Sequence, residues 1–265
     1  IVRLIPKFEA MTKPLILVTN DDGVSAPGIR ALVEVAQKLG EVVVVAPDQA
    51  RSGMGHAITL ENTLRRTSIN YFEGIEAYSC SGTPVDCVKL AVNVFLDRKP
   101  DLIISGINHG SNASVNVIFS GTMSAAVEGA MEKIPSLGFS LLDHSIDANF
   151  ETAKKYAAKI IKETLKRSIP DGICLNVNFP KRGENEIVGI KICRQCHGNW
   201  TEEFDVRIDP SGKEYYWLTG VFINYEPEAT DTDIWALDNN YISIVPVHCD
   251  MTAYSALEKL NNWTL

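Results

Sequence analysis

Long apolar runs, an export signal and an excess of positive charge are all missing from this chain. No stretch approaches the roughly 18 apolar residues that a membrane-spanning helix needs, so no membrane-embedded function is expected. Residues 1–10 lack the apolar segment and the small-residue cleavage site of a secretory signal, and Met11 is the expected natural start. Lys and Arg number 25 against 33 Asp and Glu, a formal net charge of -8. This balance argues against stable binding to nucleic-acid backbones.

Cysteines are also few, with six thiols scattered over 265 residues. Without an export signal we expect them to be reduced and the protein to be cytoplasmic. Cys193-Arg194-Gln195-Cys196-His197 matches a haem-attachment spacing, but we expect no haem in a chain without an export signal. A zinc site there would need His248 and Cys249 as additional ligands. The chain contains no Walker-type phosphate loop, and Gly53-Met54-Gly55 lacks the third glycine of a dinucleotide motif.

The first half of the chain alternates strand and helix patterns, which indicates an α/β fold with a mostly parallel sheet. Hydrophobic residues make up 45% of the chain, enough for a large core. Strands are expected at residues 15–19, 41–46, 102–105, 134–139 and 173–178, and helices at 26–39, 84–95, 122–131, 150–166 and 253–260.

Two regions depart from this alternation. Residues 49–74 are polar and irregular, as expected of a long functional loop. Residues 186–247 contain strand-like pieces separated by Gly, Pro and Asp, which predicts a hairpin subdomain that contacts other subunits. We therefore expect a catalytic core at residues 11–180, followed at 181–265 by a C-terminal hairpin arm and a closing helix that do not form an independent domain.

Asn20-Asp21-Asp22-Gly23 follows the first expected strand directly. Open α/β sheets bind their ligands at the carboxyl ends of strands, and adjacent carboxylates repel each other unless a cation lies between them. Hard cations such as Mg²⁺ take oxygen ligands of this kind. The alternative is an ordinary turn that ends the strand, because Asn, Asp and Gly are common turn formers.

Polar, glycine-rich segments also follow the second and third strands, at residues 49–53 and 105–112. Loops after parallel strands emerge at one edge of a sheet, so we expect these segments to converge with Asp21 and Asp22. Their oxygen-rich side chains favour Mg²⁺ or Mn²⁺ over Zn²⁺. Ser120-Gly121-Thr122 precedes a helix, and the start of a helix suits a phosphate. A plain helix cap explains the same residues.

Five motifs in order resemble the survival protein E (SurE) family of metal-dependent nucleotide phosphatases. They are I-L-V-T-N-D-D-G, A-P-x-x-x-x-S-G, G-T-P-x-D-C-V, P-D-L-I-I-S-G-I-N-x-G and S-G-T-x-x-A-A-x-E-G, at residues 16–23, 46–53, 82–88, 100–110 and 120–129. The resemblance implies a Rossmann-like core with a C-terminal arm exchanged between subunits. It implies a homodimer or homotetramer.

The resemblance also assigns residues. It implies one divalent metal per subunit, Mg²⁺ or Mn²⁺, held by Asp21, Asp22, Ser52 and Asn108. The phosphate contacts that it implies are Asn20, Asn112, Ser120, Gly121 and Thr122.

The expected activity is hydrolysis of nucleoside 5'-monophosphates, with 3'-monophosphates also open. No nucleophile constellation is evident, so we expect direct attack by water. Asp21 is the preferred residue to orient or deprotonate that water, and Asp22 is the alternative. His109 lies in the same segment, where an acid, a phosphate contact and a structural role all stay open. A broader phosphatase or exopolyphosphatase and a non-catalytic nucleotide sensor are the alternative functions.

Overall fold

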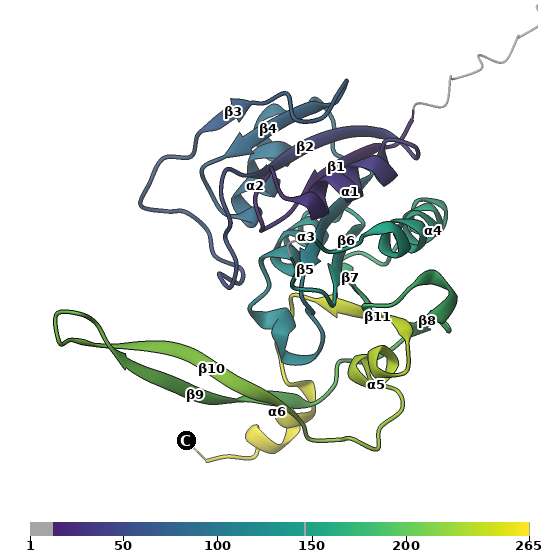
Figure 1. Ribbon diagram of the computed structural model, residues 1–265. Helices are drawn as coiled ribbons and strands as arrows, with labels where there is room; N and C mark the ends of the chain where they lie inside the picture. The colour runs from purple at the N-terminus through teal and green to yellow at the C-terminus, as the bar shows by residue number, and fades with distance from the viewer. Residues whose placement is uncertain (1–12, 146, 265) are drawn as a thin grey trace, which may run out of the picture.

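The computed structural model describes residues 13–145 and 147–264, so Met11 lies outside the described part. These residues form an α/β body from which a long β-hairpin projects (Figure 1). In the described residues the main sheet has nine strands, which in spatial order are β3 (Arg66–Ser68), β4 (Glu76–Cys80), β2 (Glu41–Pro47), β1 (Leu15–Thr19), β5 (Leu102–His109), β6 (Ser136–Leu141), β7 (Ile173–Phe179), β11 (Tyr241–His248) and β8 (Gly189–Ile192). The pairs β3–β4 and β7–β11 are antiparallel and the other pairs are parallel, which confirms the expected fold class.

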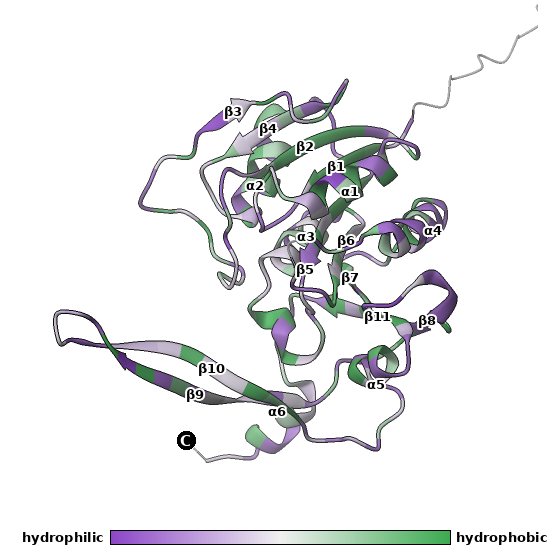
Figure 2. Ribbon diagram, in the orientation of Figure 1, coloured by the Kyte–Doolittle hydropathy of each residue, from purple (hydrophilic) through white to green (hydrophobic). Residues whose placement is uncertain are grey.

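Helices cover both faces of this sheet, which gives three layers. These helices are α1 (Pro27–Ala36), α2 (Pro84–Leu90), α3 (Gly121–Met131), α4 (Glu151–Arg167) and α5 (Asp233–Asp238). A further helix, α6 (Tyr254–Leu260), follows the last strand and buries none of its residues. Ile16 and Val18 of β1 pack in the cluster under α1 and α4, whereas Leu15 and Leu17 face the cluster under α2. Both sets are buried because successive side chains of a strand point to opposite faces. The apolar colouring of β1 and β2 in Figure 2 reflects this two-sided burial.

The order of the strands reverses at β1. From β1 the chain passes to β2 on one side and later to β5 on the other, with Thr19 opposite Ser105 in the register. A crevice opens outside the carboxyl ends of the strands at such a reversal. The segments that follow β1 and β5 therefore meet there, as the sequence predicts.

Several strands differ from the sequence expectation. β3 lies inside the stretch expected to be a loop, and β9 (Gly198–Ile208) was not expected as a strand. The patterns do not predict β4, because its Glu-Ala-Tyr-Ser-Cys sequence is half polar and has no continuous apolar run. β5 continues to His109, beyond the expected end at residue 105, through an irregularity between Ser105 and Asn108. Residues 106–109 were expected to be loop, since Gly and Asn are typical turn formers, but Asn108 and His109 pair with Ser140 and Leu141 of β6.

The C-terminal third contributes to both the sheet and the projection. β8 and β11 come from the segment expected to form the arm, yet both join the main sheet. Between them the chain forms an antiparallel hairpin of β9 (Gly198–Ile208) and β10 (Glu214–Asn224), which extends away from the body (Figure 1). None of the helices in the described residues has the length and hydrophobicity needed to span a lipid bilayer.

Candidate active site

The segment after β1 forms a closed turn. Asn20 and Asp21 are almost fully buried, and the Asn20 side-chain amide donates a hydrogen bond to the Gly23 carbonyl at 2.9 Å. Gly23 has φ +94°, and a Cβ there would lie 3.2 Å from the Gln49 carbonyl carbon. The positive φ favours glycine, and a Cβ would also press against the Gln49 backbone. The turn holds the two aspartates at the reversal point of the sheet.

Asp21 is held from two sides. Its backbone carbonyl accepts a hydrogen bond from the Arg51 N–H at 2.7 Å, and its carboxylate accepts one from the Thr122 hydroxyl. Burial raises the pKa of Asp21 to about 6; the Thr122 hydrogen bond opposes this rise and the neighbouring Asp22 adds to it. An ionised Asp21 is therefore costly in the bare protein, and a nearby positive charge would relieve that cost.

Asp22 is half-buried beside His109. Burial raises the pKa of its carboxyl group, and the charge and backbone of His109 partly offset the rise. His109 itself packs edge-on against Phe150, with ring centroids 5.3 Å apart. The histidine that the sequence singled out is thus a neighbour of the carboxylate pair.

Buried polar atoms without a hydrogen-bond partner gather at this edge of the sheet. Within the described residues six such side-chain atoms occur, and five of them belong to Thr19, Asn20, Asp22, Arg51 and Ser105. Leaving a buried polar atom unpaired costs about 1–3 kcal/mol, so each one calls for a partner such as water or an ion. Four of the five atoms are oxygens, and this donor chemistry fits a hard cation and its water shell.

The start of α3 lies against Asp21. Ser120 caps the helix by accepting a hydrogen bond from the Met123 N–H at 3.0 Å. A Cβ at Gly121 would lie only 2.7 Å from the Asp21 Cβ, so the helix can approach this closely only with glycine there. The structure therefore brings Ser120, Gly121 and Thr122 together with Asp21. The partial positive charge of a helix start falls at the carboxylate.

The loop that carries Ser52 is bound to the same place. Ser52 is exposed and follows Arg51, whose N–H bonds to Asp21. Farther along, the Gly55 N–H donates to the Phe119 carbonyl at 3.1 Å, which joins the loop to the residue before Ser120. These two backbone bonds place Ser52 beside the turn after β1.

Buried acids fix the rest of this loop. Glu128 of α3 forms a hydrogen bond of 3.1 Å with His56 Nε2 and an ion pair of 2.6 Å with Lys89. Asp86 of α2 binds the Thr59 backbone N–H at 3.1 Å and its hydroxyl at 2.6 Å. The loop expected to be functional is thus anchored to both helices of one sheet face. Sequence reasoning missed Glu128 and Asp86, which stand in the motifs as lone acids among apolar residues.

Asn108 lies at the end of β5, on the other side of the crevice. Its side-chain nitrogen donates to the carbonyls of His109 at 3.1 Å and Gly110 at 3.0 Å. Both donors of the amide are directed at the chain's own backbone, so Oδ1 is the atom that can meet a ligand. Asn108 directly precedes His109, the residue whose backbone and charge act on Asp22.

Asn112 belongs to a buried polar network. Its backbone N–H donates to Asn178 Oδ1 at 2.8 Å, and its side-chain nitrogen donates to Ser140 Oγ at 2.7 Å. Asn176 completes the network by donating to the Asn112 carbonyl at 2.8 Å. The loop after β5 is thereby braced against β6 and β7. Sequence reasoning missed Asn176 and Asn178, although alternating asparagines at the end of a buried strand are a usable signal.

The cysteine motif packs against the segment after β5, because Ser114 Oγ donates a hydrogen bond to the Cys196 carbonyl at 2.8 Å. Cys193 and Cys196 are buried, and the Cys196 N–H is bound by Asp233 Oδ1 at 2.9 Å. In the part of the chain that the structure describes, no three His, Cys, Asp or Glu side chains are grouped to hold a metal ion. A zinc site built from these cysteines therefore finds no support.

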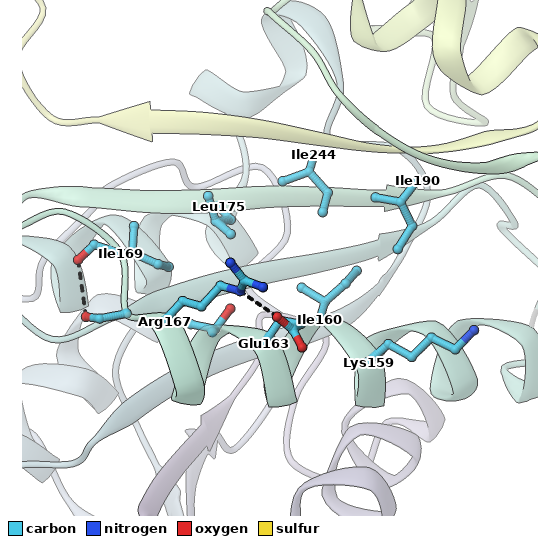
Figure 3. A pocket seen from close by; sticks show the side chains of 10 residues that line it. Lys159, Ile160, Glu163, Arg167, Ile169, Leu175, Ile190 and Ile244 are labelled. Atoms are coloured by element: carbon cyan, nitrogen blue, oxygen red, sulfur yellow. Dashed lines mark hydrogen bonds and ion pairs between the residues drawn. The ribbon is translucent and has the colours of Figure 1, made fainter.

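A cavity of about 290 Å³ lies elsewhere, between α4 and the strands β7, β8 and β11. Figure 3 shows its floor of Leu175, Ile190 and Ile244, with Arg167 bonded to Glu163 at 2.7 Å along the helix. None of the residues singled out from the sequence lines it. The chemistry-bearing residues gather instead at the open edge near β1 and β5.

The sequence and the fold both match proteins of one known family. A family model described as "Survival protein SurE" matches residues 16–202. A protein named 5'-nucleotidase SurE from Flavobacterium psychrophilum is 61% identical over 256 residues, covering 96% of this chain and 99% of that one. A protein of the same name from Phocaeicola vulgatus is 47% identical over 253 residues, covering 96% and 98%. The crystal structure of the SurE protein from Aquifex aeolicus matches with a TM-score of 0.80 and 39% identity, covering 94% and 98%.

Proposed function

The chain belongs to the survival protein SurE family, and we propose on this premise that it is a metal-dependent phosphomonoesterase that hydrolyses nucleoside monophosphates. Relatives that align over almost the whole of both chains carry the name 5'-nucleotidase. The observation that carries the proposal is the set of unpaired buried polar atoms around the adjacent carboxylates Asp21 and Asp22. Such a set suits a charged, oxygen-rich ligand at the crevice of the sheet.

The residues that would hold a divalent cation are Asp21, Asp22, Ser52 and Asn108. Their available atoms are carboxylate, hydroxyl and amide oxygens, which suit Mg²⁺ or Mn²⁺. One cation per subunit would neutralise part of the phosphate charge and polarise a phosphoryl oxygen. The raised pKa of Asp21 supports this assignment, because a buried carboxylate beside a second one gains most from a cation.

The protein's own groups have separate roles in the proposed reaction. The start of α3 binds the phosphate through backbone N–H groups, and the missing side chain of Gly121 lets this helix start lie against Asp21. The Thr122 hydroxyl fixes one oxygen of the Asp21 carboxylate, which leaves the other to orient the attacking water and accept its proton. Asn20 and Asn112, each fixed by a hydrogen bond, lie beside the phosphate in the proposed site. As the new P–O bond to water forms, the ester P–O bond breaks. The leaving oxygen takes a proton from solvent, so the products are the nucleoside and inorganic phosphate.

Phosphate release tests the proposal directly. The purified protein is assayed on nucleoside 5'- and 3'-monophosphates, sugar phosphates and short polyphosphate, with Mg²⁺, with Mn²⁺ and with a chelator. We expect release from nucleoside monophosphates that depends on the added metal. Asp22→Asn should abolish it, whereas Asp101→Asn should not, because Asp101 binds the Leu15 N–H at the opposite end of the strands. Two results would contradict the proposal: phosphate release that persists in the presence of chelator, and no phosphate release from any of the substrates.

The hairpin supports an oligomer. Cross-strand pairing places Phe204, Val206, Ile208, Tyr216 and Leu218 on one face of β9 and β10, and all five side chains are more than half exposed. Two-stranded hairpins are marginally stable alone, and an exposed apolar face of this kind marks an interaction site. We therefore assign the hairpin to contact with a second copy of the chain, in a homodimer or homotetramer.

A further inference from the structure

Three large apolar side chains remain exposed beside the proposed phosphate site. Met54, Ile118 and Phe119, here called the apolar rim, are 44%, 57% and 54% exposed. Single exposed apolar residues are ordinary on protein surfaces, but grouped ones indicate an interaction site. The grouping of these three can be established from backbone contacts.

Backbone contacts join the two segments that carry the rim. The Gly55 N–H donates to the Phe119 carbonyl at 3.1 Å, and a Cβ at Gly55 would lie 3.0 Å from the Ile118 carbonyl oxygen. Met54 therefore lies on the chain segment that runs against Ile118 and Phe119. The loop is also anchored beyond this point by Glu128 through His56, so the two halves of the rim are held in register.

The rim adjoins the site on both segments. Phe119 directly precedes Ser120, which caps α3, and Met54 lies two residues after Ser52. The α3 start and Ser52 are the positions assigned above to phosphate and to metal. A group attached to that phosphate extends from the polar crevice toward the open surface. There it meets the exposed apolar side chains near Ser52 and Ser120, which are those of the rim.

We propose that the apolar rim binds the nucleobase of the substrate, with the Phe119 ring as the stacking surface and Met54 and Ile118 as its apolar flanks. The inference rests on the proposed function and names the part of the substrate that this surface recognises. A nucleobase is a flat aromatic group one sugar away from the phosphate, and it gains from stacking on an aromatic face. Met54 suits a surface that must accept bases of different shape, because its unbranched side chain adapts readily.

This assignment has a consequence for specificity. Stacking tolerates any base, because every base has a π-face. The rim itself contributes no polar side chain that would read the edge of a base. We therefore expect little discrimination among the bases, but a clear preference for nucleoside monophosphates over phosphate esters that carry no base.

Substitution at Phe119 separates base binding from phosphate chemistry. In Phe119→Ala the KM for AMP and CMP should rise by about 10-fold, the order expected for the loss of one base–aromatic contact. The KM for ribose 5-phosphate and the kcat on all three substrates should change little. Phe119→Tyr should retain the wild-type constants. Leu60→Ala, which removes an exposed apolar side chain from the same loop, serves as the matched control.

Other results would overturn the inference. Equal losses on AMP and ribose 5-phosphate would make Phe119 a support of the phosphate site. Unchanged constants on all substrates would remove the rim from substrate binding. A lower mass of the Phe119→Ala particle in light scattering would show that the rim is covered by a second copy. If the wild type releases phosphate from neither substrate, the proposed function itself fails, and this outcome is distinct from the others.

Discussion

Replacing Asp21 by asparagine should stabilise the metal-free protein while abolishing its activity. Asp21 is 4% exposed, and burial raises its pKa to about 6 from the ordinary value of 3.8. The folded state therefore binds the proton more tightly than the unfolded state, so stability falls as pH rises from about 4 to about 6 and stays lower above this window. Asparagine has the same shape and no charge, and it still accepts a hydrogen bond from the Thr122 hydroxyl.

The size of the effect follows from the difference in pKa. A shift of about two units corresponds to roughly 3 kcal/mol of penalty once the carboxyl group is fully ionised, and about half of that remains at pH 5. Asparagine has one acceptor oxygen fewer near the start of α3. This loss reduces the gain in the free energy of unfolding by about 1 kcal/mol at either pH. The advantage of Asp21→Asn over the wild type should therefore grow by about 1.5 kcal/mol between pH 5 and pH 8. For a chain of this size that is a relative Tm shift of about 3–6 °C.

Thermal unfolding in the presence of chelator, at pH 5 and pH 8, measures this difference. Adding Mg²⁺ or Mn²⁺ should raise the Tm of the wild type at pH 8 and leave that of Asp21→Asn nearly unchanged, because the ligand binds only the intact site. Asp101→Asn is the matched control. Burial acts to raise the pKa of Asp101, but its interactions with the Leu15 N–H and with Arg98 together lower that pKa below its ordinary value, so Asp101 keeps its charge at both pH values. If the Tm difference between Asp21→Asn and the wild type is the same at both pH values, the electrostatic reasoning is refuted.

Three further predictions concern the surroundings of the site and the hairpin. Gly121→Ala forces a Cβ to within 2.7 Å of the Asp21 Cβ and should lower kcat by about 100-fold, whereas Gly189→Ala, where the nearest atom is 3.8 Å away, should have wild-type kinetics. Burial acts to raise the pKa of Glu128, but the hydrogen bonds from His56 and Lys89 and the charge of Lys89 lower it overall. Glu128→Gln should therefore cost about 2 kcal/mol in urea unfolding at pH 7, and the cost should disappear as the pH falls below about 4.5. Replacing residues 202–220 by Asn-Gly, which closes a tight hairpin, should reduce the particle mass in light scattering; an unchanged mass contradicts the oligomer assignment.

Much of the proposed site at the carboxyl edge of the sheet could be predicted from local sequence. The run Leu15–Thr19 is continuously apolar and ends in Asn-Asp-Asp-Gly, so both the strand and the polar turn follow from residue type. The same holds for α3, whose apolar pattern begins directly after Ser120. Parallel topology then requires these segments to meet at one edge. The convergence is therefore a consequence of general rules of sheet architecture rather than of any single motif.

The partners of these residues could not be predicted in the same way. Glu128 binds His56 and Lys89 across gaps of 72 and 39 positions, and Asn112 binds Asn178 across 66. Nothing local in the chain encodes such pairs, because they depend on how separate elements pack. β11 illustrates the same limit: its sequence predicts a strand, but only tertiary pairing with β7 and β8 decides that it joins the sheet.

The hairpin is an excursion that leaves and re-enters the fold at one place. β8 precedes it and β11 follows it, and these two strands are neighbours at the edge of the sheet. Arg194 closes the base of the excursion through bonds of 2.6 Å to Glu226 and 2.8 Å to Asp231. An insertion closed in this way can change in length and outer face during evolution without moving the strands that hold the proposed site. Its inner end is tied to the segment after β5, because Trp200 donates a hydrogen bond to Asn116 at 2.7 Å. Only the outer part of the hairpin is therefore free to evolve apart from the crevice.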